Sequence, residues 1–367
     1  MDSRPVVGPP VRSSENVVHA DQAIFTSQRG LMGEGYRLIA ASSALSAGER
    51  TEITRRCPSH HSLCLDSPNA VGLSSYGLES GRHCLGYCRY AGTEQSGRGG
   101  QRVHTHLAVL DGAAYGRFEG NPVRAVMALA RAVGDPPILK APPRLEPLVL
   151  SLDARPVGGQ GPLRGDLGTG HDADWLVLLM ASILTGRNVI VVGAARPFET
   201  LEWTMNAVPL SLRKTVSATV GLKWSPARQI QLSLVDYADR DTVRALHGRD
   251  IDRLDVTGVP PRPPVQAVTP YLTLIRRWWN EGRFVDIARL GSLLNGVIRA
   301  EDLAGAAGLC NDIDAIKSAE PAVLDGLIIK YTRFRPGTDA EVSLVEQFRQ
   351  QARERKEALC RSTPIPE

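Results

Sequence analysis

The chain has 367 residues, 43% apolar and 22% charged, which is typical of a globular protein with two or three domains. Its 43 basic and 39 acidic residues give a net charge of +4, and no basic block interleaved with aromatics suggests a nucleic-acid binder. No apolar run is long enough to span a membrane, residues 1–20 lack a signal-peptide core, and the six cysteines are too dispersed for a disulfide scaffold. We therefore expect a cytoplasmic protein that binds neither nucleic acid nor membranes.

The first third of the chain alternates short β-prone segments with turns. Residues 1–20 are expected to form a disordered tail, and residues 21–150 a β-rich antiparallel α+β domain. Three glycines at positions 30, 33 and 35 separate two β-prone segments and predict a hairpin. Residues 82–90 and 101–110 are predicted to pair as strands across a Gly- and Ser-rich loop.

A helix follows these strands. Asn121 is a plausible N-cap and Pro122 suits the first helical position, which predicts a helix that extends to Val133. The segment after it is rich in Pro and Gly and contains one short strand, residues 148–152, so the first domain boundary is expected there.

Residues 151–256 are expected to form an α/β middle domain. A helix at 173–185 is apolar on nearly every side, and the strand at 188–193 is continuously apolar, as interior elements are. Asp172 is expected to cap this helix and Asp174 to complement its positive end. An amphipathic helix at 197–208 and strands at 217–222 and 230–235 complete the domain.

Proline-rich residues 257–266 predict a linker, and residues 267–360 an all-helical carboxy-terminal domain. About five helices are expected, with breaks near residues 281–282, 295–296, 320–321 and 336–337. The fold class is thus α+β multidomain, with a β-rich antiparallel amino-terminal domain, an α/β middle domain and a helical carboxy-terminal domain.

The hairpin also carries a family resemblance. Phe-Thr-Ser at 25–27, Gly-x-Gly-Tyr at 33–36 and Ala-x-Ser-x-x-Leu at 40–45 resemble the opening of the bacterial GTPase-associated proteins, which are found beside GTPases in conflict systems. The resemblance covers residues 21–133 and extends to 172–236. In addition, residues 175–192 are similar in pattern to the central region of DENN modules, which engage small GTPases. Both resemblances imply an adaptor or regulator without catalytic residues of its own.

We therefore expect a non-enzymatic protein that couples a GTPase to other components of a conflict or signalling system, such as an ATPase, without a cofactor. No Gly-Lys dipeptide occurs in the chain, so it is not expected to be a P-loop GTPase itself. The expected contact residues lie in the hairpin, in the loop at 193–198 and in a basic, aromatic cluster after the linker: Gly33, Gly35, Tyr36, Arg196, Phe198, Arg276, Arg277, Trp278 and Trp279. Since two adjacent tryptophans cannot both face one core, at least one is expected to be partly exposed or to cover the domain junction. For this cluster, an interface within the chain is favoured over a partner surface.

A metal- or histidine-dependent hydrolase is the alternative function. Its candidate residues are Cys57, His60, His61, His104 and His106, and Cys64 could join the first three as a zinc ligand. The cysteine spacing differs from that of paired zinc knuckles, so buried cysteines and surface histidines remain the other interpretation, and no metal site is assigned. His104 and His106 are expected on one face of a strand, as an acid–base pair or as structural residues. The family resemblance implies an architectural role for His106.

Overall fold

The computed structural model describes residues 16–30, 33–94, 100–135, 137–138, 142–152, 171–236, 242, 244, 246–261, 269–296 and 299–362. The chain forms two compact units. The first comprises Met1–Val157 and Ser217–Ile230, and the second comprises Gly158–Val216 and Gln231–Glu367. Antiparallel strands, parallel strands and a helical carboxy-terminal part confirm the α+β multidomain class.

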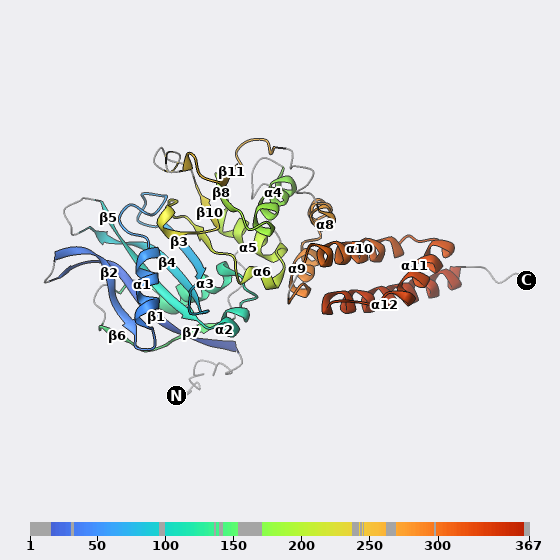
Figure 1. The fold of residues 1–367 in the computed structure, drawn as a ribbon, viewed down its shortest axis with the longest axis horizontal. Coiled ribbons are helices and arrows are strands. Elements are labelled where there is room, and N and C mark those ends of the chain that lie inside the picture. Colours follow the sequence, from blue (N-terminus) through green and yellow to red (C-terminus); the bar gives the residue numbers. More distant parts are fainter. Residues whose placement is uncertain are drawn as a thin grey trace, which may run out of the picture. The chain divides into compact units, whose positions relative to one another are not determined.

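A mainly antiparallel sheet is the centre of the first unit. Its strand order is β9-β3-β4-β5-β1-β2-β6, with β7 beside β1 (Figure 1). The strands are β1 (Val17–Gly30), β2 (Gly33–Ser42), β3 (Val71–Gly77), β4 (His83–Thr93), β5 (Gln101–Leu110), β6 (Arg144–Leu145), β7 (Leu148–Ser151) and β9 (Ala218–Val220). The predicted β1–β2 hairpin and β4–β5 pair are both confirmed. Strand β1 begins within the predicted tail, because Val17 to Ala20 pair with β7.

Helices cover both faces of this sheet. They are α1 (Ala47–Arg56), α2 (Gly112–Gly116) and α3 (Pro122–Val133), and a short 3₁₀ turn, η2, spans Pro226–Arg228. Cys84 packs in one core cluster with Ile53 of α1, whereas its neighbour His83 stacks on Tyr115 of α2. Since neighbouring strand residues point to opposite faces, α1 and α2 lie on opposite sides of β4. The predicted N-cap of α3 is confirmed, since the Asn121 side chain accepts hydrogen bonds from two backbone N–H groups.

The second unit contains a parallel sheet, in which β8 (Asn188–Val192) lies between β10 (Leu232–Val235) and β11 (Ile251–Asp255). Its first helix, α4 (Asp172–Leu184), is buried along most of its length, as its apolar sequence predicts. The expected cap is wrong by one residue. His171 occupies the N-cap without a side-chain cap bond, and Asp172 is the first helical residue, so it contributes with Asp174 to the acidic first turn.

The other helices whose bounds the structure describes in the second unit are α5 (Pro197–Ala207), α6 (Leu210–Arg213), α8 (Pro270–Asn280), α9 (Phe284–Leu293), α10 (Ala300–Ile316), α11 (Pro321–Arg333) and α12 (Asp339–Ser362). The five helices expected after the linker and the breaks between them are confirmed in the described residues. Buried polar contacts fix α8 and α6 near the end of α5. The hydroxyl of Tyr271 donates to the carbonyl of Ala207 at 2.6 Å, and a fully buried Arg213 donates to the carbonyls of Asn206 and Val208.

The last three helices lie side by side, with α12 in contact with both α10 and α11 (Figure 1). In the described part of the chain, no helix combines the length and the hydrophobicity needed to cross a bilayer.

Candidate partner-binding site

The hairpin of the first unit holds three of the expected contact residues, because Gly33, Gly35 and Tyr36 all lie in β2. The half-buried Tyr36 is fixed by its hydroxyl, which donates to Glu94 Oε2 at 2.8 Å and accepts from the backbone N–H of Val103 at 3.0 Å. Burial raises the pKa of Tyr36, and the Glu94 carboxylate raises it further. The neutral phenol therefore anchors the hairpin to β4 and β5.

Glu94 is the central acceptor of this region and was missed at the sequence level. Its side chain is fully buried, Ser27 Oγ donates to its Oε1 at 2.6 Å, and His60 Nδ1 lies 3.9 Å from its Oε2. Glu94 follows β4 within the predicted loop, where a glutamate would ordinarily be solvent-exposed. Only the register of β4, β5 and β1, which brings Glu94 beside Ser27, could have indicated its role.

Strand β2 also presents an open edge. On one side β1 pairs with it from Gly33 to Ala41, whereas on the other side β6 pairs only with Ala41 and Ser42. Among the described strands, none pairs with the rest of this outer edge. An unpaired edge offers backbone donors and acceptors to an added strand. A Cβ atom placed on Gly35 would meet nothing within 4 Å, so the surface is open at this position.

The loop between β8 and α5 holds two further expected contact residues in the second unit. Gly193 has a φ of +78°, and a Cβ atom there would lie 2.4 Å from Thr257 Cγ2, so this position requires glycine. Arg196 occupies the N-cap of α5 and forms an ion pair with Glu199 at 2.7 Å. Both Arg196 and Phe198 are half-buried. The loop is thus closely packed, with part of each side chain open to solvent.

The basic, aromatic cluster lies on α8. Arg276 is 53% exposed and pairs with Asp174 of α4 at 2.5 Å. Trp278 and Trp279 are only 4% and 8% exposed. Neither ring is exposed to a partner, because Trp279 makes an edge-on contact with Phe284 of α9 and Trp278 Nε1 donates to Asp314 of α10, so both lie in contacts within the chain. A partner at this surface would meet the arginines and not the indole rings.

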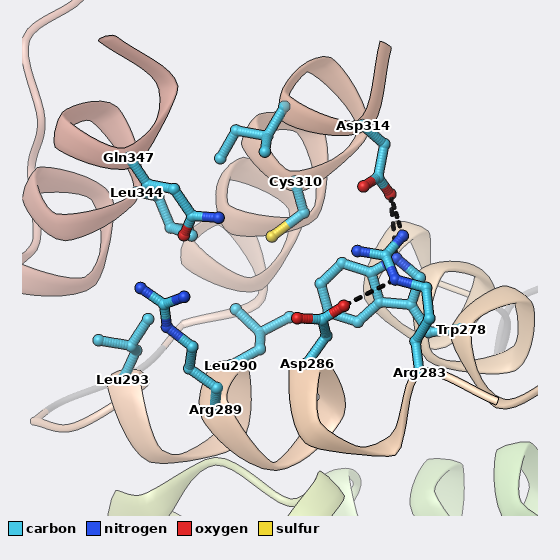
Figure 2. Close-up of a pocket in the computed structure, with 11 residues that line it drawn as sticks. Trp278, Arg283, Asp286, Arg289, Leu290, Leu293, Cys310, Asp314, Leu344 and Gln347 are labelled. Carbon is cyan, nitrogen blue, oxygen red and sulfur yellow. Dashed lines mark hydrogen bonds and ion pairs between the residues drawn. The ribbon is translucent and has the colours of Figure 1, made fainter. Parts of the chain in front are cut away.

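One carboxylate of α10, Asp314, organises this cluster (Figure 2). Its Oδ2 accepts hydrogen bonds from Arg277 at 2.5 Å, from Trp278 Nε1 at 3.1 Å and from Arg283 at 2.6 Å. Burial by itself would raise the pKa of Asp314, but the bonds from Arg283 and Trp278 outweigh it, and the pKa is lowered. The charged carboxylate therefore connects α8 to α10 and fixes the segment between α8 and α9.

Beside Asp314 is a small hollow between α9, α10 and α12 (Figure 2). Arg289 and Gln347 extend into it from opposite sides, and Cys310 lies at its back. Burial raises the pKa of the Cys310 thiol to about 12, so the thiol is neutral at physiological pH. These residues come from three helices far apart in the sequence, and no local motif indicated that they would meet.

The candidate zinc ligands do not converge on one point. The rings of His60 and His61 are in contact, with centroids 3.8 Å apart, whereas Cys64 is buried and Cys57 packs against the core cluster below α1. Burial raises the pKa of Cys57 well above that of a free thiol. In the part of the chain that the structure describes, no three His, Cys, Asp or Glu side chains form a group that could hold a metal ion.

His104 and His106 face the same side of β5, as expected, with ring centroids 6.4 Å apart. His106 Nε2 donates to Gln22 Oε1 at 2.7 Å, and His104 Nε2 donates to the carbonyl of Ile138 at 3.0 Å. Burial lowers the pKa of His104 to about 4 and that of His106 to about 3. Both rings are therefore neutral at physiological pH and held by fixed acceptors.

The comparison with protein families agrees with the sequence of the hairpin. Residues 19–148 match the family described as GTPase-associated protein 1, N-terminal domain type 2. The match runs from β1 to the start of β7 and therefore includes the open edge of β2. No curated protein matches the chain. The resemblance to the GTPase-associated proteins is thus confirmed for residues 19–148.

Proposed function

We propose that this protein is a non-enzymatic adaptor or regulator that binds a GTPase in a bacterial conflict or signalling system. The proposal is supported by the match of residues 19–148 to a domain named for its association with GTPases. Other components of the same system, such as an ATPase, would be recruited by further surfaces. The binding role requires no cofactor and is compatible with a cytoplasmic location.

The open edge of β2 is the surface that we propose for the GTPase. It lies within the family-matched residues, and Tyr36 and Glu94 fix its position from the buried side. A partner strand added to this edge would gain main-chain hydrogen bonds, and side chains around Gly35 would give specificity. Because β2 is already paired with β1, binding would not carry the entropic cost of forming this strand.

Arg196, Phe198, Arg276 and Arg277 form a second proposed contact region, which belongs to the other unit. The exposed guanidinium of Arg276 can contribute to a partner interface, whereas the buried indoles of Trp278 and Trp279 support the helix that carries it. Replacement of both tryptophans would therefore disturb the fold as well as the surface. Arg276→Glu is the cleaner test of this region, with Arg253→Glu as a control at a similarly exposed, ion-paired arginine.

The first experiment is affinity purification of the tagged protein from its host, followed by mass spectrometry of the proteins that accompany it. Wild type is compared with Gly35→Arg, which places a long side chain on the β2 surface. Gly77→Arg is the matched control, because a Cβ atom at this strand glycine of the same domain also meets nothing within 4 Å. We expect a GTPase at near-equal stoichiometry with wild type and Gly77→Arg, and at least about tenfold less with Gly35→Arg.

Recovery of no GTPase with any of the three proteins would contradict the adaptor function. Equal recovery with wild type, Gly35→Arg and Gly77→Arg would mean that the GTPase does not contact the β2 surface. The hydrolase alternative has a separate test. Stoichiometric zinc in the purified protein, lost on replacement of His60 or His61, would favour it.

A further inference from the structure

A second open groove lies between α11 and α12, outside the family-matched residues. Ile328 and Tyr331 of α11 and Phe348 and Ala352 of α12 form its apolar floor. Its volume is about 690 Å³ including the open mouth. Tyr331 and Phe348 are in ring contact, with centroids 4.3 Å apart, so the floor is a fixed surface.

A row of cations borders the groove. Arg349, Arg353 and Lys356 follow each other at intervals of four and three residues along α12, which places them on one face of the helix. All three are exposed. No carboxylate pairs with any of them among the residues that the structure describes, and the only hydrogen bond from Arg353 goes to the backbone carbonyl of Arg349.

The lining of the groove contains these three cations and no acidic residue, and several of the acidic residues near it contact other groups. On α12 itself, Glu354 accepts from Gln350 and Glu357 pairs with Arg361. On the neighbouring helices, Asp312 holds Lys330 at 2.5 Å and also accepts from the hydroxyl of Tyr331. An occupant with its own carboxylates would therefore find free cationic partners along one side of an apolar floor.

We propose that the groove binds an acidic amphipathic helix of a partner protein. Phe348 and Lys356 are eight residues apart on α12, so the lined part extends for about 12 Å, or about two helical turns. A helix of this kind would place apolar side chains at positions i, i+3, i+4 and i+7 on the floor and its carboxylates against the cation row. This site is independent of the β2 edge, so the protein has two surfaces with different partner chemistry, as an adaptor requires.

The test uses the full-length protein and a fluorescein-labelled helical peptide about four turns long, with Leu on one face and Glu beside it. Binding is followed by fluorescence anisotropy. Three other probes separate the possible occupants: the same peptide with Lys for Glu, a single-stranded oligonucleotide and vesicles of anionic phospholipid. The variant Arg349→Glu/Arg353→Glu reverses the charge at two of the three cations in the row, and Ile328→Gln makes the floor more polar.

The charge-matched control is Arg55→Glu/Lys214→Glu, at two exposed cations outside the groove. We expect the acidic peptide to bind wild type and the control equally, and to bind Arg349→Glu/Arg353→Glu and Ile328→Gln at least about tenfold more weakly. The Lys peptide should not bind wild type. Circular dichroism verifies that each variant keeps its helices.

The proposal is overturned if the acidic peptide does not bind, or if it binds all variants equally. It is also overturned if only the oligonucleotide or the vesicles bind in a way that depends on Arg349 and Arg353, or if sedimentation shows that a second copy of this chain occupies the groove. Since the peptide assay involves no GTPase, its failure leaves the β2 proposal standing, and failure of the β2 proposal does not alter this result.

Discussion

At the scale of single residues, Asp314 connects α10 to α8 and to the segment that precedes α9. It holds Arg277, Trp278 and Arg283 with one oxygen atom. We expect Asp314→Asn to lower the free energy of unfolding by about 2 kcal/mol, because hydrogen bonds between charged groups are lost. Urea unfolding measures this effect. Asp325→Asn, at an exposed carboxylate of α11, is the control and should change it by less than about 0.5 kcal/mol.

The pH dependence of this difference follows from the lowered pKa of Asp314. A carboxyl group whose pKa is lower in the folded state stabilises the fold above its unfolded pKa, and this contribution disappears as the pH falls through its folded pKa. The difference in the free energy of unfolding between wild type and Asp314→Asn should therefore be largest at neutral pH and disappear below about pH 4. A gap of the same size in acid would mean that the ion pairs are not its source.

At the scale of elements, β5 combines two buried histidines whose pKa values are lowered to about 4 and about 3. Below their ordinary pKa of 6.5, the unfolded chain takes up protons that the folded chain does not, so stability falls as the pH falls. We expect each ring to contribute about 1.4 kcal/mol per pH unit to this slope between about pH 6 and pH 5. Urea midpoints across this range should give a shallower slope for His106→Gln.

The contribution of the His106 ring is identified by the slope of stability against pH. Stability at a single pH does not identify it, because the substitution also changes packing near Gln22. His19→Gln serves as the control for the same substitution at an exposed histidine. An unchanged slope for His106→Gln would mean that its ring takes up its proton equally in the folded and unfolded states.

Elements with strong local signals were predictable, and contacts between distant elements were not. Asn121 and Pro122 define the start of α3 by their own side-chain chemistry, and the apolar sequence of β8 marks it as an interior strand. Glu94 and Asp314 are the opposite case. Their roles depend on the strand register and on how α8 and α10 pack, and neither has a signature within a short stretch of sequence. The same limit explains the tryptophans, since their burial depends on coverage by α9 and α10.

At the scale of the whole molecule, the first unit is assembled from two separated segments of the chain. Ser217–Ile230 supplies β9, which pairs with β3, and Leu222, which packs in a core cluster with Leu63 and Val103. We expect a fragment of residues 16–157 alone to be less stable and to aggregate, since it leaves the β3 edge and this cluster uncovered. The same fragment joined to residues 217–230 by a flexible linker should unfold at a higher urea concentration and remain monomeric.

We attribute the higher stability of the joined fragment to packing and not to its greater length. A third fragment distinguishes these two explanations. In the joined fragment, Leu222→Asp would place a carboxylate in the fully buried position of Leu222, so it should lose most of the gain in the urea midpoint. Light scattering should then show aggregation again. If residues 16–157 alone were as stable as the joined fragment, the second segment would not be integral to the first unit. A domain defined only by its family match, residues 19–148, would then suffice for partner-binding experiments.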